Sequence, residues 1–224
     1  EKDRKRFIDQ MSDNKQVPSA LLTEEYLKTF RRFRSTYFEQ PENGGFPKEI
    51  LNEFEIGGGY IDRFGFQRDV IPIRDIDGEL RAYSCRDITD KAIYEMKYLL
   101  TKNFDKDKVL YNLNRAKNCM DDRKALIMVE GFKSVWKLYM AGYENAVSCM
   151  GSSVTSGQQG LLYSNASEVI LLLDMDKAGV KGVLRTLEDM RSKIRMKVLY
   201  LPYVDTDPAD YNVDDIKKVI GGYY

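Results

Sequence analysis

Two carboxylates placed two residues apart are the clearest chemical feature of this sequence. Asp174 and Asp176 follow the most apolar run in the chain, residues 169–173, which has the composition of a strand buried on both faces of a parallel sheet. Residues two apart share one face of a strand, so both carboxylates can point the same way. At ~4 Å two such charges repel by roughly 4 kcal/mol at an effective dielectric of 20, and a divalent cation removes that repulsion. The competing interpretation, a solvated turn with an aspartate at the helix N-cap, accounts for Asp176 alone.

Acidic residues also follow two other predicted strands. The apolar run 125–129 ends at Glu130, and the segment after it has the apolar spacing of a helix. A third strand is predicted over residues 198–202. Three aspartates come shortly after it: Asp205, Asp207 and Asp210. Ligands of open α/β sheets gather at the carboxyl ends of the strands, so these acidic groups predict a hard-oxygen site suited to Mg²⁺ or Mn²⁺.

The order and spacing of these residues resemble the Toprim domain, which is shared by primases, type IA and type II topoisomerases and some nucleases. The finer resemblance is to the RNA polymerase domain of bacterial DnaG-type DNA primases and their phage relatives. In the second half it rests on Met128-Val129-Glu130-Gly131-Phe132, Gly151-Ser152, Leu173-Asp174-Met175-Asp176-Lys177-Ala178-Gly179, and Leu201-Pro202 followed by Asp207-Pro208-Ala209-Asp210.

The first half distinguishes primases from other Toprim proteins. It resembles the primase family at Gly45-Phe46-Pro47-Lys48-Glu49-Ile50, Val70-Ile71-Pro72-Ile73-Arg74-Asp75 with Gly78, Arg86, Lys97-Tyr98-Leu99, Phe104-Asp105-Lys106 and Leu110-Tyr111-Asn112-Leu113. The resemblance extends over residues 37–215.

This resemblance implies an enzyme that synthesises short RNA primers on single-stranded DNA by metal-dependent nucleotidyl transfer. It implies that Glu130, Asp174 and Asp176 are catalytic, and that these three bind Mg²⁺ or Mn²⁺ together with Asp207 and Asp210. Contacts to nucleotide or DNA, by charge-assisted bonds to phosphate or by base stacking, are expected from five residues: Arg74, Arg86, Lys97, Tyr98 and Lys106. The implied partners are the DNA template, ribonucleoside triphosphates and a replicative helicase that binds through segments outside this chain.

Three positions depart from the family pattern. Ser134 stands where the family usually has an aspartate four residues after its glutamate, and Ala209 interrupts the family's Asp-Pro-Asp. The family's Gly-Gly-Arg reads Ser84-Cys85-Arg86 in this chain. None of these changes removes a catalytic carboxylate, so the expected activity stands and the number of bound metal ions is left open.

Two other functions stay open at this point. A Toprim nuclease or a topoisomerase-like enzyme uses the same carboxylates to cleave DNA, and only the first half of the chain speaks against it. A catalytically inert scaffold that binds DNA or a replisome protein is the second alternative, for which Ser134 and Ala209 leave room.

Composition narrows the class of protein. With 224 residues, 43% of them hydrophobic, the chain forms one large domain or two closely associated small ones. Three widely spaced cysteines predict a reducing cytoplasm (the host's if the protein is phage-encoded), and no apolar stretch approaches the ~20 residues of a membrane helix. The sequence contains no histidine, which excludes His-based catalysis and Cys/His zinc sites in these residues. Because the chain begins at Glu1, we expect it to be part of a longer protein.

The pattern along the chain predicts an α/β protein in three segments. Residues 1–121 form a basic α+β subdomain that faces template or nucleotide. Residues 122–212 alternate strand and helix, which predicts a Toprim domain with a mostly parallel four-stranded sheet flanked by helices. Residues 213–224 form a helical tail.

Two features of the first segment bear on function. A hairpin is predicted from strands over 70–74 and 79–85, with Asp77-Gly78 in its turn. A basic cluster lies upstream: Lys28, Arg31, Arg32 and Arg34. The cluster is either a solvated helix face or a patch that faces the template, in a chain whose 35 basic and 35 acidic residues balance.

Overall fold

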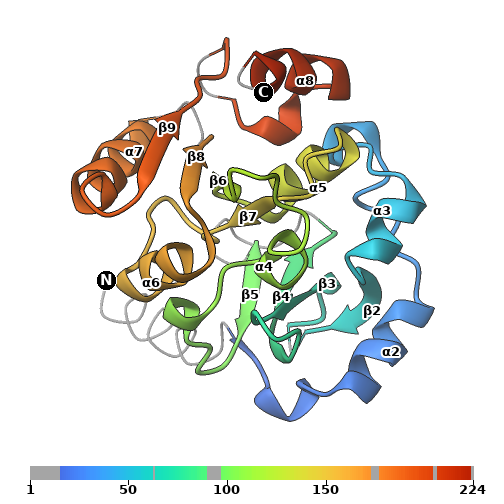
Figure 1. Ribbon diagram of the computed structural model, residues 1–224. Coiled ribbons are helices and arrows are strands. Elements are labelled where there is room, and N and C mark those ends of the chain that lie inside the picture. Colours follow the sequence, from blue (N-terminus) through green and yellow to red (C-terminus); the bar gives the residue numbers. More distant parts are fainter. Residues whose placement is uncertain (1–15, 63, 90–96, 173–176, 204–205, 223–224) are drawn as a thin grey trace, which may run out of the picture. The chain divides into compact units, whose positions relative to one another are not determined.

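The structure is a computed structural model that describes residues 16–62, 64–89, 97–172, 177–203 and 206–222. The chain divides into two compact units, whose elements are labelled in Figure 1. Unit 1 comprises residues 1–73 and 80–104, and unit 2 comprises residues 74–79 and 105–224.

Unit 1 is built on a five-stranded sheet in the order β1-β5-β4-β3-β2. Its strands are β1 (Gln16–Val17), β2 (Gly57–Ile61), β3 (Gln67–Arg74), β4 (Leu80–Asp87) and β5 (Tyr98–Thr101). The predicted hairpin is confirmed as β3 and β4. Its turn is closed by Asp75, whose Oδ1 accepts hydrogen bonds from the backbone N–H groups of Asp77 and Glu79, both at 3.0 Å. This hairpin brings its tip, residues 74–79, into unit 2.

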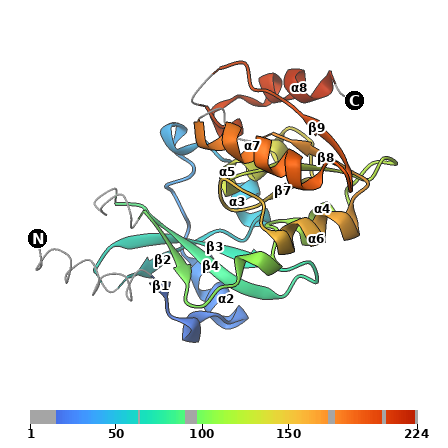
Figure 2. The ribbon, with the colours of Figure 1, turned by 90° about the vertical axis from the view of Figure 1, so that its left-hand side faces the viewer.

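Helix α2 (Glu24–Arg32) covers one face of this sheet (Figure 2). Thr23 caps its amino end by accepting a hydrogen bond from the N–H of Tyr26 at 3.2 Å. Leu27 and Phe30, at helical spacing, pack into a core with strand residues that include Val70 and Tyr83. Three shorter helices complete the described part of unit 1: η1 (Ser19–Leu21), η2 (Pro41–Asn43) and α3 (Lys48–Glu53).

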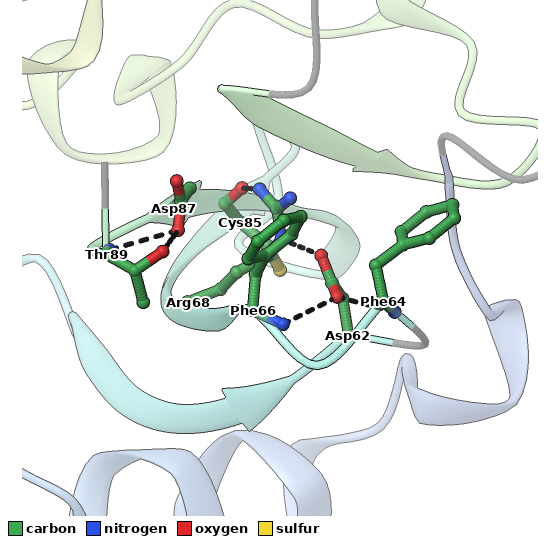
Figure 3. A network of polar contacts seen from close by, with 7 residues as sticks. All are labelled: Asp62, Phe64, Phe66, Arg68, Cys85, Asp87 and Thr89. Atoms are coloured by element: carbon green, nitrogen blue, oxygen red, sulfur yellow. Dashed lines mark hydrogen bonds and ion pairs between the residues drawn. The ribbon is translucent and has the colours of Figure 1, made fainter. Parts of the chain in front are cut away.

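A network of buried polar groups fixes the turn from β2 to β3 (Figure 3). Asp62 Oδ1 accepts hydrogen bonds from the N–H groups of Phe64 and Phe66, and its Oδ2 accepts one from Arg68 Nε at 2.6 Å. Arg68, which is 0% exposed, also donates from Nη1 to the carbonyl of Cys85 on β4 at 3.2 Å. Because a buried charge left without its partner is costly, this ion pair ties the turn to the sheet.

Unit 2 contains a four-stranded, all-parallel sheet in the order β7-β6-β8-β9. Its strands are β6 (Ala125–Val129), β7 (Ala146–Ser148), β8 (Glu168–Leu171) and β9 (Arg195–Val198). The predicted parallel α/β arrangement is therefore confirmed. The position predicted for the last strand, 198–202, is wrong. Residues 195–198 pair with β8, whereas Tyr200, in the middle of the predicted strand, is 66% exposed.

Helices cover both faces of the parallel sheet. The described helices of unit 2 are α4 (Leu113–Ala116), α5 (Phe132–Met140), α6 (Ser156–Asn165), α7 (Lys177–Met190) and α8 (Val213–Gly221), with the short 3-10 helices η4 (Lys106–Lys108) and η5 (Pro208–Asp210). The chain steps from β6 to β7 in one direction and then through β8 to β9 in the other. Right-handed crossovers therefore place α5 on one face and α6 and α7 on the opposite face. Helix α8 contacts α5, so these two share a face.

The predicted first segment is residues 1–121, whereas the continuous part of unit 2 already begins at residue 105. Residues 105–121 belong to unit 2, where Tyr111 forms a β-bridge with Ser148 and Leu113 joins the core of the parallel sheet. None of the described helices is long and apolar enough to cross a membrane.

Candidate active site

Glu130 stands directly after β6, at the carboxyl end of the parallel sheet. Its backbone carbonyl accepts hydrogen bonds from Ser148 Oγ at 2.5 Å and from the N–H of Gly151 at 3.2 Å. These two bonds tie the end of β6 to the end of β7 and to the loop that follows it. The side chain of Glu130 is half-buried, and the amino end of α5, with its partial positive charge, begins two residues later. The chain thus holds this carboxylate at a firmly anchored strand end.

Strand β8 ends beside β6. The N–H of Leu172 donates to the carbonyl of Met128 at 2.9 Å, so the chain leaves β8 next to the strand that carries Glu130. Asp174 and Asp176 fall in 173–176, which lies outside the described residues. Asp205 also lies outside the described residues. Their roles stay predictions. Among the described residues no three His, Cys, Asp or Glu side chains group closely enough to hold a metal ion.

The structure brings Asp207 to α5. Ser134, which is 2% exposed, donates from Oγ to Asp207 Oδ1 across 3.5 Å, one helical turn beyond Glu130. Asp207 Oδ1 also accepts from the N–H of Ala209 at 2.5 Å, and the N–H of Asp207 donates to Asp210 Oδ2 at 3.0 Å. This reciprocal pair caps η5. Asp210 is exposed.

Burial, and secondarily the charge of Asp210, raise the pKa of Asp207 above its usual value. A half-buried carboxylate beside a second one is costly in its ionised form, and a divalent cation would offset that cost. Glu130 and Asp207 are hard oxygen donors of the kind that Mg²⁺ and Mn²⁺ prefer, so the described donors fit such an ion.

Lys106 reaches the same end of the sheet from η4. A Cβ atom built on Gly151 would lie only 2.9 Å from Lys106 Nζ, so the ammonium group lies against this glycine. Gly151 is also the residue whose N–H donates to the carbonyl of Glu130. Cys149 is buried close by, and burial raises the pKa of its thiol to about 11. The charge of Glu130 raises that pKa further and the charge of Lys106 lowers it, so both charges act on the buried thiol.

Gln158 is a positioning residue that sequence reasoning missed. It is 0% exposed, and its Nε2 donates to the carbonyls of Val109 at 2.9 Å, Cys149 at 3.1 Å and Lys106 at 3.3 Å. It therefore holds η4 against the loop after β7. The sequence carried one sign of its position: Thr155 stands three residues before it, and this spacing is typical of a capping box, which the two residues form at the start of α6.

Arg86 and Tyr98 lie together in unit 1. Arg86 is 4% exposed, donates from Nη2 to the hydroxyl of Tyr37, and stacks 4.9 Å and 5.4 Å from the ring centres of Tyr37 and Tyr98. Its charge also acts on buried Asp69, whose pKa burial raises to about 6. These contacts hold the Arg86 side chain inside unit 1. Tyr98, 39% exposed, presents part of its ring to solvent.

Lys97 and Arg74 have different surroundings. Lys97 is exposed, immediately before β5. Arg74 lies at the hairpin tip, where its Nη1 donates to the carbonyl of Gly78 at 2.9 Å. Lys117 Nζ donates to the carbonyl of Ile76 at 2.8 Å, which fixes this tip within unit 2. Of the predicted phosphate contacts, Lys106 is therefore the one that the described residues place near Gly151, whose N–H donates to the carbonyl of Glu130.

Two family models match consecutive parts of this chain. Residues 24–117 match the N-terminal domain of the DNA primase catalytic core, and residues 124–201 match the Toprim domain. The second match spans the parallel sheet and contains Glu130, while the first begins at α2 and ends just after α4.

Curated relatives agree with these matches. A DNA primase of Synechococcus elongatus is 32% identical over 177 residues, which are 72% of this chain and 25% of that protein. A DNA primase of Enterococcus faecalis is 31% identical over 208 residues, 85% of this chain and 33% of that protein. The chain thus spans between a quarter and a third of the length of these relatives.

Solved structures share the fold. The RNA polymerase domain of the Mycobacterium tuberculosis primase DnaG superposes with a TM-score of 0.69 at 20% identity, covering 91% of this chain and 78% of that one. A DNA primase domain from Pseudomonas aeruginosa gives 0.69 at 23% identity, with 88% and 77% covered. With both domains present in the order that the family has, this chain belongs to the DnaG-type DNA primases and carries their RNA polymerase domain.

Proposed function

We propose that this chain joins ribonucleotides into short RNA primers on a single-stranded DNA template. The observation that carries the proposal is the contact of Ser134 with Asp207 one helical turn after Glu130, at the carboxyl end of a Toprim sheet that follows the N-terminal domain of a primase core. One structural relative is a DnaG primase catalytic domain bound to single-stranded DNA.

Each carboxylate has a proposed role in nucleotidyl transfer. A bound Mg²⁺ or Mn²⁺ would neutralise the triphosphate and favour ionisation of the attacking 3′-hydroxyl. Glu130 would lie nearest the reacting centre as a metal ligand or proton acceptor. Asp174 and Asp176 would hold the metal or metals that bind the nucleotide's triphosphate, and Asp207 and Asp210 would complete the negative cluster.

Cations and an aromatic ring bind the substrates in this proposal. Lys106 places its ammonium beside the end of β6, where a triphosphate oxygen would neutralise it. Lys97 and Tyr98 offer an exposed cation and a partly exposed ring for the template strand, and Arg74 is a further phosphate contact. Arg86, buried against Tyr37 and Tyr98, supports the Tyr98 ring, so any effect on phosphate is through its charge.

One assay separates this function from the two alternatives. The chain is incubated with single-stranded DNA, labelled ribonucleotides and Mn²⁺. Oligoribonucleotides indicate a primase, cleaved template indicates a nuclease or topoisomerase-like enzyme, and DNA binding alone indicates an inert scaffold. The match to the primase N-terminal domain favours the first outcome over the second.

Lys106→Ala and Lys97→Ala are expected to weaken binding of template or nucleotide. If each touches a DNA phosphate, each should also reduce the salt slope of single-stranded DNA affinity by about 0.7, because one fewer counterion is released. The measurement is DNA affinity across a salt series, with nucleotide KM beside it. Lys108→Ala is the matched control, because its side chain is 80% exposed. Wild-type slopes, affinities and KM in both variants would show that these lysines are ordinary surface cations.

Ser134→Asp is expected to make the metal-free protein less stable by about 1–3 kcal/mol, because a carboxylate at this buried position faces Asp207. Mn²⁺ should then raise its melting temperature by more than it raises that of the wild type. Thermal unfolding with and without Mn²⁺ measures both effects, with exposed Ser164→Asp on α6 as the control. Equal Mn²⁺ shifts in wild type and variant would place the metal away from Ser134.

A further inference from the structure

A buried lysine faces the acidic cluster. Lys137 lies on α5, three residues after Ser134, and is 8% exposed. Residues 133, 134 and 137 fall within one stripe of the helix, about 100° wide at 3.6 residues per turn. The same stripe carries the contact from Ser134 to Asp207, and α5 packs against η5, so Lys137 lies on the side of α5 that η5 covers.

The electrostatics of the stripe agree with this placement. Burial, and then the like charge of Lys133, lower the pKa of Lys137, while Asp207 and Asp210 oppose that shift. The charge of Lys133 in turn lowers the pKa of Asp207. Two lysines of α5 and two aspartates of η5 therefore form one coupled group of charges. A buried ammonium is costly unless anions compensate it, and these aspartates offset part of that cost.

We propose that Lys137 is a positioning residue whose ammonium holds Asp207 and η5 against α5 and supplies part of the positive charge that a divalent ion otherwise provides. The proposal rests on the proposed function, because it treats Asp207 as part of the metal cluster. If Lys137 has this role, the carboxylates around Asp207 keep their arrangement without a metal ion. They then bind divalent ions less tightly than they would without the lysine.

The test is Mn²⁺ titration by calorimetry on wild type, Lys137→Met and Lys137→Arg. Methionine keeps the length and the apolar stem of the side chain but removes the charge. It should tighten Mn²⁺ binding by roughly tenfold at low salt, because a unit positive charge no longer repels the ion. Arginine keeps the charge and should return the affinity to the wild-type value. Lys218→Met is the control for loss of one charge elsewhere in unit 2, because the Lys218 side chain on α8 is 77% exposed.

The interaction of Lys137 with Asp207 can also be measured in the absence of metal. A double-mutant cycle of Lys137→Met and Asp207→Asn, followed by denaturant unfolding in EDTA, should give a coupling between the two positions. Additive effects in EDTA, or equal Mn²⁺ affinities in wild type and Lys137→Met, would overturn the role of Lys137. Coupling in EDTA together with no Mn²⁺ binding by the wild type would retain that role and overturn the proposed metal-dependent function instead.

Discussion

Glu130→Gln is expected to reduce primer synthesis by at least about 10³-fold while leaving affinity for single-stranded DNA close to that of the wild type. The amide keeps the size of the side chain but loses the charge that binds metal or accepts a proton, a role that matters in the transition state more than in template binding. The hydrogen bonds from Ser148 Oγ and the N–H of Gly151 end on the backbone carbonyl of Glu130, not on its side chain, so the strand end should keep its structure.

The measurement for Glu130→Gln is primer synthesis at saturating template and nucleotide, beside DNA affinity by fluorescence anisotropy. Exposed Glu188→Gln on α7 serves as the control for loss of one carboxylate in the same unit. Substantial synthesis by Glu130→Gln would remove Glu130 from the chemistry. A parallel loss of DNA affinity would instead assign it to template binding.

Asp174→Asn and Asp176→Asn are each expected to abolish synthesis and to leave the metal-free protein as stable as the wild type or slightly more stable. Removal of one member of a mutually repelling pair relieves repulsion, which is worth roughly 1–4 kcal/mol at ~4 Å depending on the effective dielectric. The same change removes a metal ligand, so the stabilisation that Mn²⁺ gives the wild type should shrink.

Thermal unfolding with EDTA and with Mn²⁺ tests both parts of this expectation. Asp189→Asn is the control, because this aspartate lies on the exposed side of α7 and accepts a hydrogen bond from Gln159 at 3.4 Å. Wild-type synthesis by both variants would contradict the metal-cluster assignment. An undiminished Mn²⁺ shift in an inactive variant would separate the role of these aspartates in catalysis from metal binding.

Much of the fold could be predicted because its signals are local. The continuous apolar runs before Glu130 and Asp174 predicted central parallel strands, and the spacing around Asp77-Gly78 predicted the β3–β4 hairpin. Strand β9 was misplaced because it is an edge strand: only one of its sides pairs, and its residues alternate between charged and apolar. The apolar residues just after it made a stronger but misleading pattern.

Contacts between distant residues were beyond the sequence pattern. Ser134 was noticed as a departure from the family, but nothing local places its hydroxyl against Asp207, 73 residues later. Arg86 has the residue type of a phosphate ligand, yet packing against Tyr37 and Tyr98 buries it. Lys137 was not singled out at all, because a lysine on an amphipathic helix is ordinarily a surface residue. Tertiary packing decides the environment of all three.

Primer synthesis on a defined single-stranded DNA template is the most direct test of the central claim. The chain is incubated with the template, labelled ribonucleotides and Mn²⁺, and the products are separated by length and treated with alkali. We predict short, alkali-labile products that are complementary to the template and that disappear with EDTA or with Glu130→Gln. Cleaved template without such products, or DNA binding with no new product at all, would contradict the account.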